Sequence, residues 1–125
     1  MTTKTRILVV DDDPDTLALL ESIFSSHGYE VTSSPSGTIA LDLLRGGLRP
    51  CLILIDLEMP AMNGEQVRLA LAQDAALKDI PVVITSASRE HLERLGLSIQ
   101  QLEKPFSLNV LIQIVEKHCS PVAKK

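Results

Sequence analysis

Acidic residues follow two of the most apolar runs in this chain of 125 residues. Asp11 and Asp12 come directly after the run 7–10, and Asp56 comes directly after the run 52–55. In an open parallel sheet whose first and third strands are central neighbours, these carboxylates would converge at the edge where ligands bind. Crowded carboxylates repel one another, which raises their pKa values unless a cation relieves the repulsion. Mg²⁺ suits such a place, because it takes one or two carboxylates and keeps several waters.

Two further side chains extend the chemistry of this edge. Ser86 lies two residues after the apolar run 82–84, and Lys104 follows a weaker run at 99–102. A metal ion and a lysine together neutralise the oxygens of a phosphoryl group, and a hydroxyl can donate to one of them. Asp56 is then the candidate nucleophile, whose attack on phosphorus forms an acyl phosphate.

The strands that must position these residues are short. Runs 7–10, 52–55 and 82–84 are continuously apolar, which is typical of strands buried on both faces of a parallel sheet. The runs 31–32 and 99–102 are weaker and are expected to form the remaining two strands.

Helical patterns separate the strands, and several have a residue that can cap their start. Asp13 can cap a helix that has Pro14 at its first position, and Gly28 can end it. Asn63 and Gln66 have the spacing of a capping box. The other helices are expected after Ser36, from Arg89 to Leu95 and after Ser107. In chain order, the residues expected to point inward from the four longer helices are Leu17, Leu20 and Phe24; Ile39 and Leu43; Val67, Ala70 and Leu71; and Leu108, Leu111, Ile112 and Val115. Five alternating β and α elements predict a parallel sheet with helices on both faces.

Composition and charge restrict the possible functions. Twelve Lys and Arg against sixteen Asp and Glu give a net charge of -4, which disfavours broad binding to nucleic acid or anionic lipid. No apolar run approaches the ~20 residues of a membrane span, and no signal peptide is evident, so we expect a cytoplasmic domain. Cys51 and Cys119 lack a metal-ligand spacing, and two separated, unpaired thiols in a reduced protein are expected. We expect one domain over 1–125, with a core at about 6–118 and a frayed tail at 119–125.

Four segments together resemble one known family. They read ILVVDDD at 7–13, LIDLEMPAMNG at 54–64, PVVITSA at 81–87 and EKPF at 103–106. Each is a weak motif alone, but all four occur in order at the ends of four predicted strands. From about Arg6 to His118 the chain therefore resembles the receiver domain of two-component response regulators, in its stand-alone, single-domain form.

The resemblance implies a flavodoxin-like, doubly wound (βα)5 fold with five parallel strands in the order 2-1-3-4-5. It also implies a phosphorylation switch. A partner histidine kinase or histidine phosphotransfer protein would donate the phosphoryl group with Mg²⁺ present, and the domain would catalyse its own phosphorylation and slow hydrolysis without being a turnover enzyme. Output would pass to a downstream protein target, through the region of the fourth helix and the fifth strand and helix. We expect a monomer or weak dimer.

The resemblance assigns roles to individual residues of the site. Ser86, five residues after Pro81, matches the family's hydroxyl position, and Thr85 lies one place too early. The peptide bond between Lys104 and Pro105 would be cis and aim the lysine inward. The full set is Asp56 as phosphoacceptor, Asp12 as direct metal ligand, Asp11 as a ligand mainly through water, Asp56 and the backbone carbonyl of Glu58 as further ligands, and Ser86 and Lys104 as contacts of the phosphoryl group.

The chain departs from the family pattern in two places. Receivers usually carry Tyr or Phe three residues before the lysine, where the ring follows the hydroxyl inward; this switch position is Gln101 here. The stretch between Ser86 and Lys104 is about one helical turn shorter than usual, which predicts a truncated fourth helix. We therefore expect an intact site with altered transmission.

Two alternatives come from other classes of protein. The first is a receiver-like docking module that works without phosphorylation, which Gln101 and the short fourth helix favour. The second is a Mg²⁺-dependent phosphohydrolase with Asp56 as nucleophile, but such enzymes commonly use an Asp where this chain has Glu58. The histidines His27, His91 and His118 are interpreted as exposed and structural, without a partner in the site.

Overall fold

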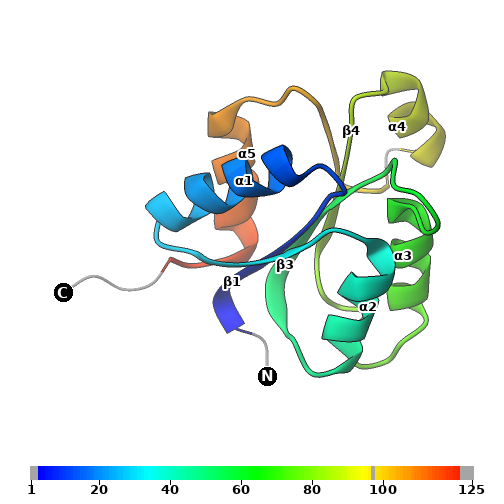
Figure 1. The fold of residues 1–125 in the computed structure, drawn as a ribbon, viewed down its shortest axis with the longest axis horizontal. Coiled ribbons are helices and arrows are strands. Elements are labelled where there is room, and N and C mark those ends of the chain that lie inside the picture. Colours follow the sequence, from blue (N-terminus) through cyan, green and yellow to red (C-terminus); the bar gives the residue numbers. More distant parts are fainter. Residues whose placement is uncertain (1–2, 97, 122–125) are drawn as a thin grey trace.

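In this computed structural model, residues 3–96 and 98–121 are described, and five parallel strands form one sheet in the order β2-β1-β3-β4-β5. The predicted doubly wound α/β fold and its strand order are confirmed (Figure 1). Along the chain the elements are β1 (Thr3–Val10), α1 (Pro14–Ser26), β2 (Glu30–Ser34), α2 (Gly37–Arg45), β3 (Pro50–Asp56), α3 (Gly64–Ala72), β4 (Val82–Ser86), α4 (Arg89–Leu95), β5 (Gln101–Glu103) and α5 (Leu108–His118).

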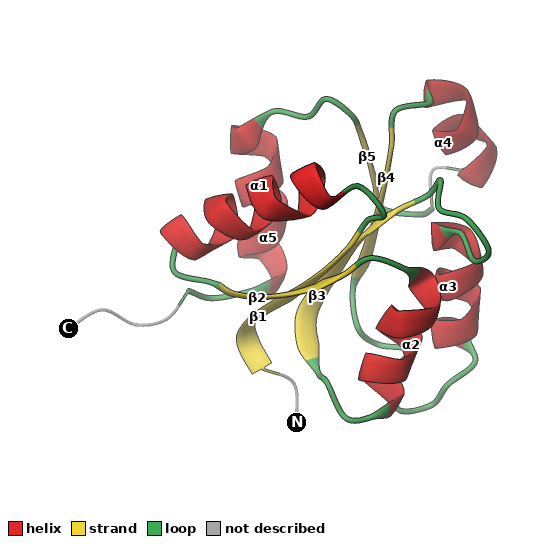
Figure 2. Cartoon of the chain, in the orientation of Figure 1, coloured by secondary structure: helices red, strands yellow, loops and turns green. Residues whose placement is uncertain are grey.

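Helices cover both faces of the sheet (Figure 2). α1 and α5 lie on one face, where Phe24, Leu52 and Leu111 belong to one buried apolar cluster. α2, α3 and α4 lie on the other face, where Ile53 and Val67 belong to a second cluster. Every residue of β3 is buried, because this central strand is covered on both faces, as its continuous apolar run predicts.

The predicted capping residues begin the helices. The Asp13 side chain accepts from the Asp15 backbone N–H at the start of α1. Asn63 and Gln66 form a complete capping box at the start of α3. These side chains satisfy backbone donors that the first helical turn leaves free, so the loops after β1 and β3 end at defined places next to the acidic residues.

Two predicted inward residues are instead exposed. Ile39 is 46% exposed, because α2 turns Gly37 and Ala40 inward. A Cβ on Gly37 would lie 2.7 Å from a methyl carbon of Val67, so the close contact between α2 and α3 requires the small residue there. Leu108 is 47% exposed because it is the first residue of α5, and the buried stripe begins one turn later with Leu111.

The expectation of two separated, unpaired cysteines is wrong. Cys51 and Cys119 form a disulfide, with their Cα atoms 5.5 Å apart, and both are buried. α5 runs back across the sheet, so Cys119, directly after its last residue, returns to the starts of the strands although 68 positions separate the two cysteines. The Ser120 N–H then donates to the Lys4 carbonyl at 2.9 Å. The predicted frayed tail at 119–125 therefore does not begin at Cys119, and its residues 122–125 lie outside the described residues.

Among the residues that the structure describes, no helix combines the length and the apolar character needed to cross a membrane.

Candidate functional site

Three carboxylates gather at the carboxyl edge of the sheet. Asp11 directly follows β1, and Asp56 ends β3. These two strands are paired neighbours in the sheet. Together with Asp12, Asp11 and Asp56 offer oxygens that all lie within 4.8 Å of one another. Asp11 and Asp56 are 3% and 6% exposed, whereas Asp12 is open to solvent. The sequence-predicted convergence of the three side chains is therefore present in the fold.

Lys104 reaches this cluster from the loop after β5. Its Nζ lies 2.8 Å from Asp11 Oδ2 and 3.4 Å from Asp56 Oδ1. The Lys104 backbone N–H donates to the Ser86 carbonyl at 2.7 Å, and the peptide bond to Pro105 is cis, as the family resemblance implied. The Lys104 ammonium thus contacts both buried carboxylates, and its contact with Asp11 joins residues 93 positions apart in the sequence.

Burial and neighbouring charges determine the pKa values in the cluster. Burial raises the pKa of Asp56 to about 6, and the charges of Asp11 and Glu58 act in the same direction, while Lys104 opposes them. Burial lowers the pKa of Lys104, but its hydrogen bond to Asp11 and the two carboxylate charges outweigh that effect and raise it. The ionised form of Asp56 is therefore costly, mainly because the carboxylate is buried, and a divalent cation would relieve that cost.

The loop after β3 is packed against the backbone of Asp56. The Leu57 N–H donates to the Thr85 carbonyl at 2.8 Å, and the Gly64 N–H donates to the Leu57 carbonyl at 3.1 Å. A Cβ on Gly64 would lie 2.7 Å from the Asp56 backbone oxygen. Only glycine permits this approach, so the Asn63–Gly64 pair fixes the start of α3 directly beneath the acidic edge.

Ser86 is fully buried at the end of β4, and its hydroxyl is already occupied. The Oγ lies 2.7 Å from each carboxylate oxygen of Glu58, to which it donates, and it accepts from the Ser88 N–H at 2.9 Å. Glu58 Oε2 also lies 2.9 Å from Nδ1 of His91. Because an ionised carboxylate only accepts, Nδ1 carries the hydrogen in this contact.

The Glu58 side chain and His91 are therefore members of the site that sequence reasoning missed. Only the backbone carbonyl of Glu58 was predicted to take part, and His91, although exposed as predicted, has a partner beside the site in the Glu58 carboxylate. A usable signal exists in the sequence. Ser88 caps α4 by accepting from the His91 N–H, so a helix predicted to start after Ser88 has His91 in its first turn, next to the loop that follows β4.

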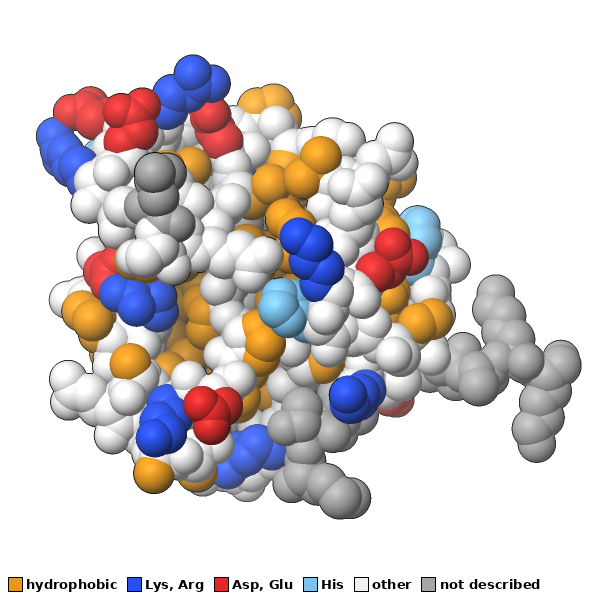
Figure 3. Space-filling model, turned by 180° about the vertical axis from the view of Figure 1, so that it is seen from behind, with side chains coloured by type: hydrophobic (Ala, Val, Ile, Leu, Met, Phe, Trp, Pro, Cys, Tyr) orange, Lys and Arg blue, Asp and Glu red, His pale blue; other side chains and the backbone are white. Residues whose placement is uncertain are grey.

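Gln101, the predicted switch position, contacts the far end of α4. Its Nε2 donates to the Gly96 carbonyl at 3.0 Å, just past the last helical residue. The prediction of a shortened fourth helix agrees with the seven residues of α4. Figure 3 shows acidic and basic side chains gathered at the corner of the molecule that α4 occupies, where Glu90 pairs with Arg94 and Arg89 with Glu103.

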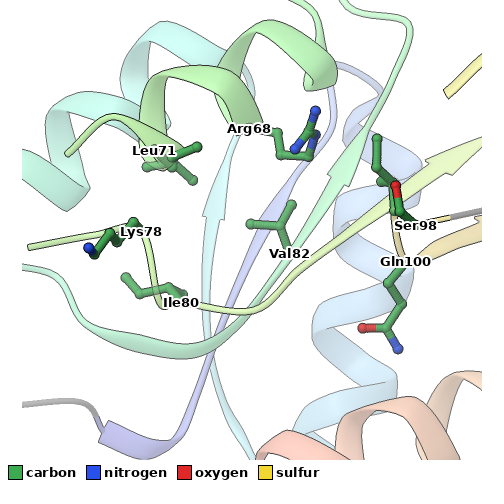
Figure 4. Close-up of a pocket in the computed structure, with 9 residues that line it drawn as sticks. Arg68, Leu71, Lys78, Ile80, Val82, Ser98 and Gln100 are labelled. Atoms are coloured by element: carbon green, nitrogen blue, oxygen red, sulfur yellow. The ribbon is translucent and has the colours of Figure 1, made fainter. Parts of the chain in front are cut away.

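A separate pocket of about 280 Å³ lies at the opposite edge of the sheet (Figure 4). Its lining includes Val82 at the start of β4, Gln100 just before β5, and Leu71 from α3. Because parallel strands run away from this edge toward the carboxylates, the pocket is not part of the acidic site.

The chemistry of the acidic edge suits a hard divalent cation beside a phosphoryl group. Asp11, Asp12 and Asp56 offer only oxygen ligands, the type that Mg²⁺ prefers. Lys104 supplies a positive charge on the other side of Asp56. The residues present therefore fit a magnesium ion, and Asp12 leaves the ion a route to solvent because it is exposed.

The strand order and the acidic cluster at the carboxyl edge of the sheet are typical of the receiver class of signalling domain. The sequence model of the response regulator receiver domain matches residues 7–116, and the chain belongs to this family, whose members are signalling modules of two-component systems. The chain is 32% identical to protein PilH of Pseudomonas aeruginosa over 114 residues, covering 88% of this chain and 93% of PilH. It is 30% identical to the polar-differentiation response regulator DivK of Brucella anthropi over 116 residues, covering 90% and 94%.

A solved structure gives the same result. Response regulator protein TrrA of Thermotoga maritima, solved in complex with Mg²⁺ and BeF, is 30% identical, with a TM-score of 0.78. The match covers 94% of this chain and 98% of TrrA.

Proposed function

We propose that this receiver domain is a phosphorylation switch in which Asp56 accepts a phosphoryl group with Mg²⁺ present. The observation that carries the proposal is the contact of Lys104 with both Asp11 and Asp56 at 2.8 and 3.4 Å, because it places a cation beside the nucleophile and beside the acidic cluster. The structure of the relative TrrA with Mg²⁺ and BeF supports it by similarity.

The chemical step is a substitution at phosphorus. An oxygen of the Asp56 carboxylate attacks the phosphorus atom of the donor, a new P–O bond forms, and the bond from phosphorus to the donor atom breaks. With a phosphohistidine donor the leaving group is the imidazole. The pKa of about 6 leaves most of Asp56 ionised at neutral pH, so the nucleophile is available before the donor arrives.

Lys104 and Ser86 contact the oxygens of the transferred group. The Lys104 ammonium neutralises charge that develops on them, and the Ser86 hydroxyl donates to one of them once it leaves Glu58. Asp11, Asp12, Asp56 and the backbone carbonyl of Glu58 would hold Mg²⁺. When bound, the ion neutralises phosphoryl oxygens as a Lewis acid.

The natural donor is proposed to be a histidine kinase or a histidine phosphotransfer protein, as membership of the family implies. Water attack on phosphorus, with cleavage of the bond to Asp56, would return the domain to its starting state. Output is proposed to pass by protein contacts to a downstream target, and cytoplasmic location stays a prediction.

Intact mass after incubation with acetyl phosphate tests the proposal. The wild type should gain one phosphoryl group only when Mg²⁺ is present, and Asp56→Asn should gain none. Asp13→Asn is the matched control, because Asp13 belongs to the same acidic run but caps α1, and Asn keeps the cap. This variant should be phosphorylated as the wild type is.

Absence of a mass gain in the wild type, or an equal gain in Asp56→Asn, would overturn the proposal. The first result would favour the docking module that works without phosphorylation.

A further inference from the structure

We infer that Glu58 and His91 are positioning residues that hold the Ser86 hydroxyl away from Asp56, and that phosphorylation releases this hold and passes the change to α4. The inference rests on the proposed function and goes beyond it by naming a relay in a chain that lacks the aromatic residue at Gln101.

The relay consists of two consecutive hydrogen bonds. The hydroxyl of Ser86 shares its one hydrogen between the two oxygens of Glu58, each 2.7 Å away. Glu58 in turn accepts from Nδ1 of His91 at 2.9 Å. Both bonds involve a carboxylate, and such charge-assisted hydrogen bonds are stronger than those between neutral groups.

The Ser86 hydrogen cannot serve two acceptors in different directions. Phosphoryl oxygens only accept, so the single hydrogen of the buried Ser86 hydroxyl is all that it can offer a phosphoryl group, while its oxygen accepts from the Ser88 N–H. Donation to a phosphoryl oxygen on Asp56 therefore requires that the bond to Glu58 break. A free Glu58 carboxylate then loses one of the two groups that hold it.

The second half of the relay reaches the surface through α4. His91 lies in the first turn of this helix, and Gln101 holds the last turn through the Gly96 carbonyl. α4 is thus tied at its start to the phosphorylation site and at its end to β5. When Glu58 loses Ser86 and moves, its bond from His91 shifts or breaks, which leaves the start of α4 held by its Ser88 cap while Gln101 still holds the other end.

Release of Glu58 also alters an accessible surface. The side chains of His91 and Glu58 are 45% and 40% exposed and, together with Asn63 and Arg94, line a hollow between the loop after β3 and α4. A partner protein at this place would meet a different arrangement of charges before and after release. The relay therefore gives the chain an output that requires no inward-turning ring.

A double-mutant cycle on the rate of phosphorylation tests the relay. The rate of mass gain from acetyl phosphate with Mg²⁺ is measured for wild type, His91→Ala, Ser86→Ala and the double variant. Loss of the bond from His91 loosens Glu58 and makes the Ser86 hydroxyl available more often, so His91→Ala should react roughly threefold to tenfold faster. In the Ser86→Ala background there is no hydroxyl to release, and the same change should alter the rate less than about twofold.

Two variants separate positioning from a general effect on α4. His91→Asn keeps an N–H donor near the place of Nδ1 and should restore a rate within roughly twofold of the wild type. Glu93→Ala changes an exposed residue of the same helix and should leave the rate unchanged.

A spectroscopic measurement follows the relay directly. The chain has three histidines, and the ring signals of His91 in an NMR spectrum are identified by their absence in His91→Asn. These signals should move on phosphorylation of the wild type and stay in place on phosphorylation of Ser86→Ala. His27 and His118 serve as internal references.

The possible failures are distinguishable. If the wild type gains no phosphoryl group, the proposed function fails, and the relay has nothing to transmit. If the wild type is phosphorylated but His91→Ala has the same effect with and without Ser86, has no effect, or slows the reaction, only the relay is overturned. Unmoved His91 signals in the phosphorylated wild type would overturn it as well.

Discussion

The acidic pocket and the α4 side of the molecule are built in different ways. In the pocket, Asp11 and Asp56 sit at the ends of paired strands, so the backbone of the sheet determines their separation. Beside α4, the ends of the helix are held by hydrogen bonds from side chains, those of His91 to Glu58 and of Gln101 to Gly96.

This difference indicates which contacts of the domain can change without loss of the fold. Residues placed by the sheet keep their geometry as long as the fold exists, since moving them requires breaking strand pairing. Contacts made by long side chains on a short helix cost little to exchange and are able to break and re-form. We therefore place the proposed phosphoryl chemistry in the part that the sheet builds, called the rigid half, and the proposed transmission in the part around α4, called the adjustable half.

The largest expected change in stability comes from the disulfide between Cys51 and Cys119, which belongs to neither the acidic site nor the contacts of α4. Replacing the disulfide with alanines, Cys51→Ala with Cys119→Ala, removes a link across 68 residues, and we expect a loss of about 4 kcal/mol in the free energy of unfolding. Urea unfolding measures it. A reductant should destabilise the wild type similarly and leave the double variant unchanged. Equal stability of oxidised and reduced wild type would contradict the link.

Loss of the Lys104 charge should have the largest effect on phosphorylation in the rigid half. Lys104→Met removes the positive charge that contacts Asp11 and Asp56, so phosphorylation by acetyl phosphate should slow by about a hundredfold. Intact mass against time measures the rate. Lys78→Met is the control, because Lys78 is an exposed lysine at the opposite edge of the sheet. A Lys104→Met rate within about twofold of the wild type would show that the pocket works without this charge.

The raised pKa of Asp56 predicts that this residue lowers the free energy of unfolding in a pH-dependent way. The folded value of about 6 lies above 3.8, so without Mg²⁺ the ionised form costs stability above pH 6, and the cost disappears as pH falls toward 3.8. Asp56→Asn should therefore be more stable than the wild type by about 2–3 kcal/mol at pH 7.5. The gap should nearly close at pH 4.

Chemical denaturation at several pH values without Mg²⁺ measures this gap. Asp79→Asn, which alters an exposed carboxylate, should show no such pH-dependent gap from the wild type. A constant difference between Asp56→Asn and the wild type across the pH range would contradict the raised pKa.

The smallest expected effect falls in the adjustable half. Gln101→Ala removes one partly buried hydrogen bond to the Gly96 carbonyl, which contributes about 1 kcal/mol. Hydrogen exchange should show weaker protection of the α4 amides, with β3 unchanged, and phosphorylation should stay within about twofold. Weaker protection throughout the domain would mean that α4 does not move independently of the sheet.

Sequence patterns predicted the rigid half well, for a physical reason. A buried strand needs a continuous apolar run, and the residue at its end lies at a known edge of the sheet, so Asp11, Asp56 and Ser86 could be located without coordinates. Caps such as Asp13 and Asn63 were likewise visible, because few side chains can satisfy the free N–H groups of a first turn.

The remaining features depend on packing between distant elements. Ile39 was expected inward, but the close approach of α2 and α3 selects Gly37 and Ala40 for that face. The disulfide requires knowing that the end of α5 returns to the start of β3. The contact of His91 with Glu58 depends on side-chain directions across a loop, which periodicity does not specify.

Chemical trapping of the acyl phosphate tests the central claim most directly. Borohydride reduces an aspartyl phosphate to homoserine and leaves free carboxylates unchanged, so peptide mass mapping locates the acceptor. After incubation with acetyl phosphate and Mg²⁺, we predict homoserine at position 56 alone, and none when Mg²⁺ is left out. Homoserine at Asp11 or Asp12, or no homoserine in a protein that has gained a phosphoryl group, would contradict the assignment of Asp56 as the phosphoacceptor.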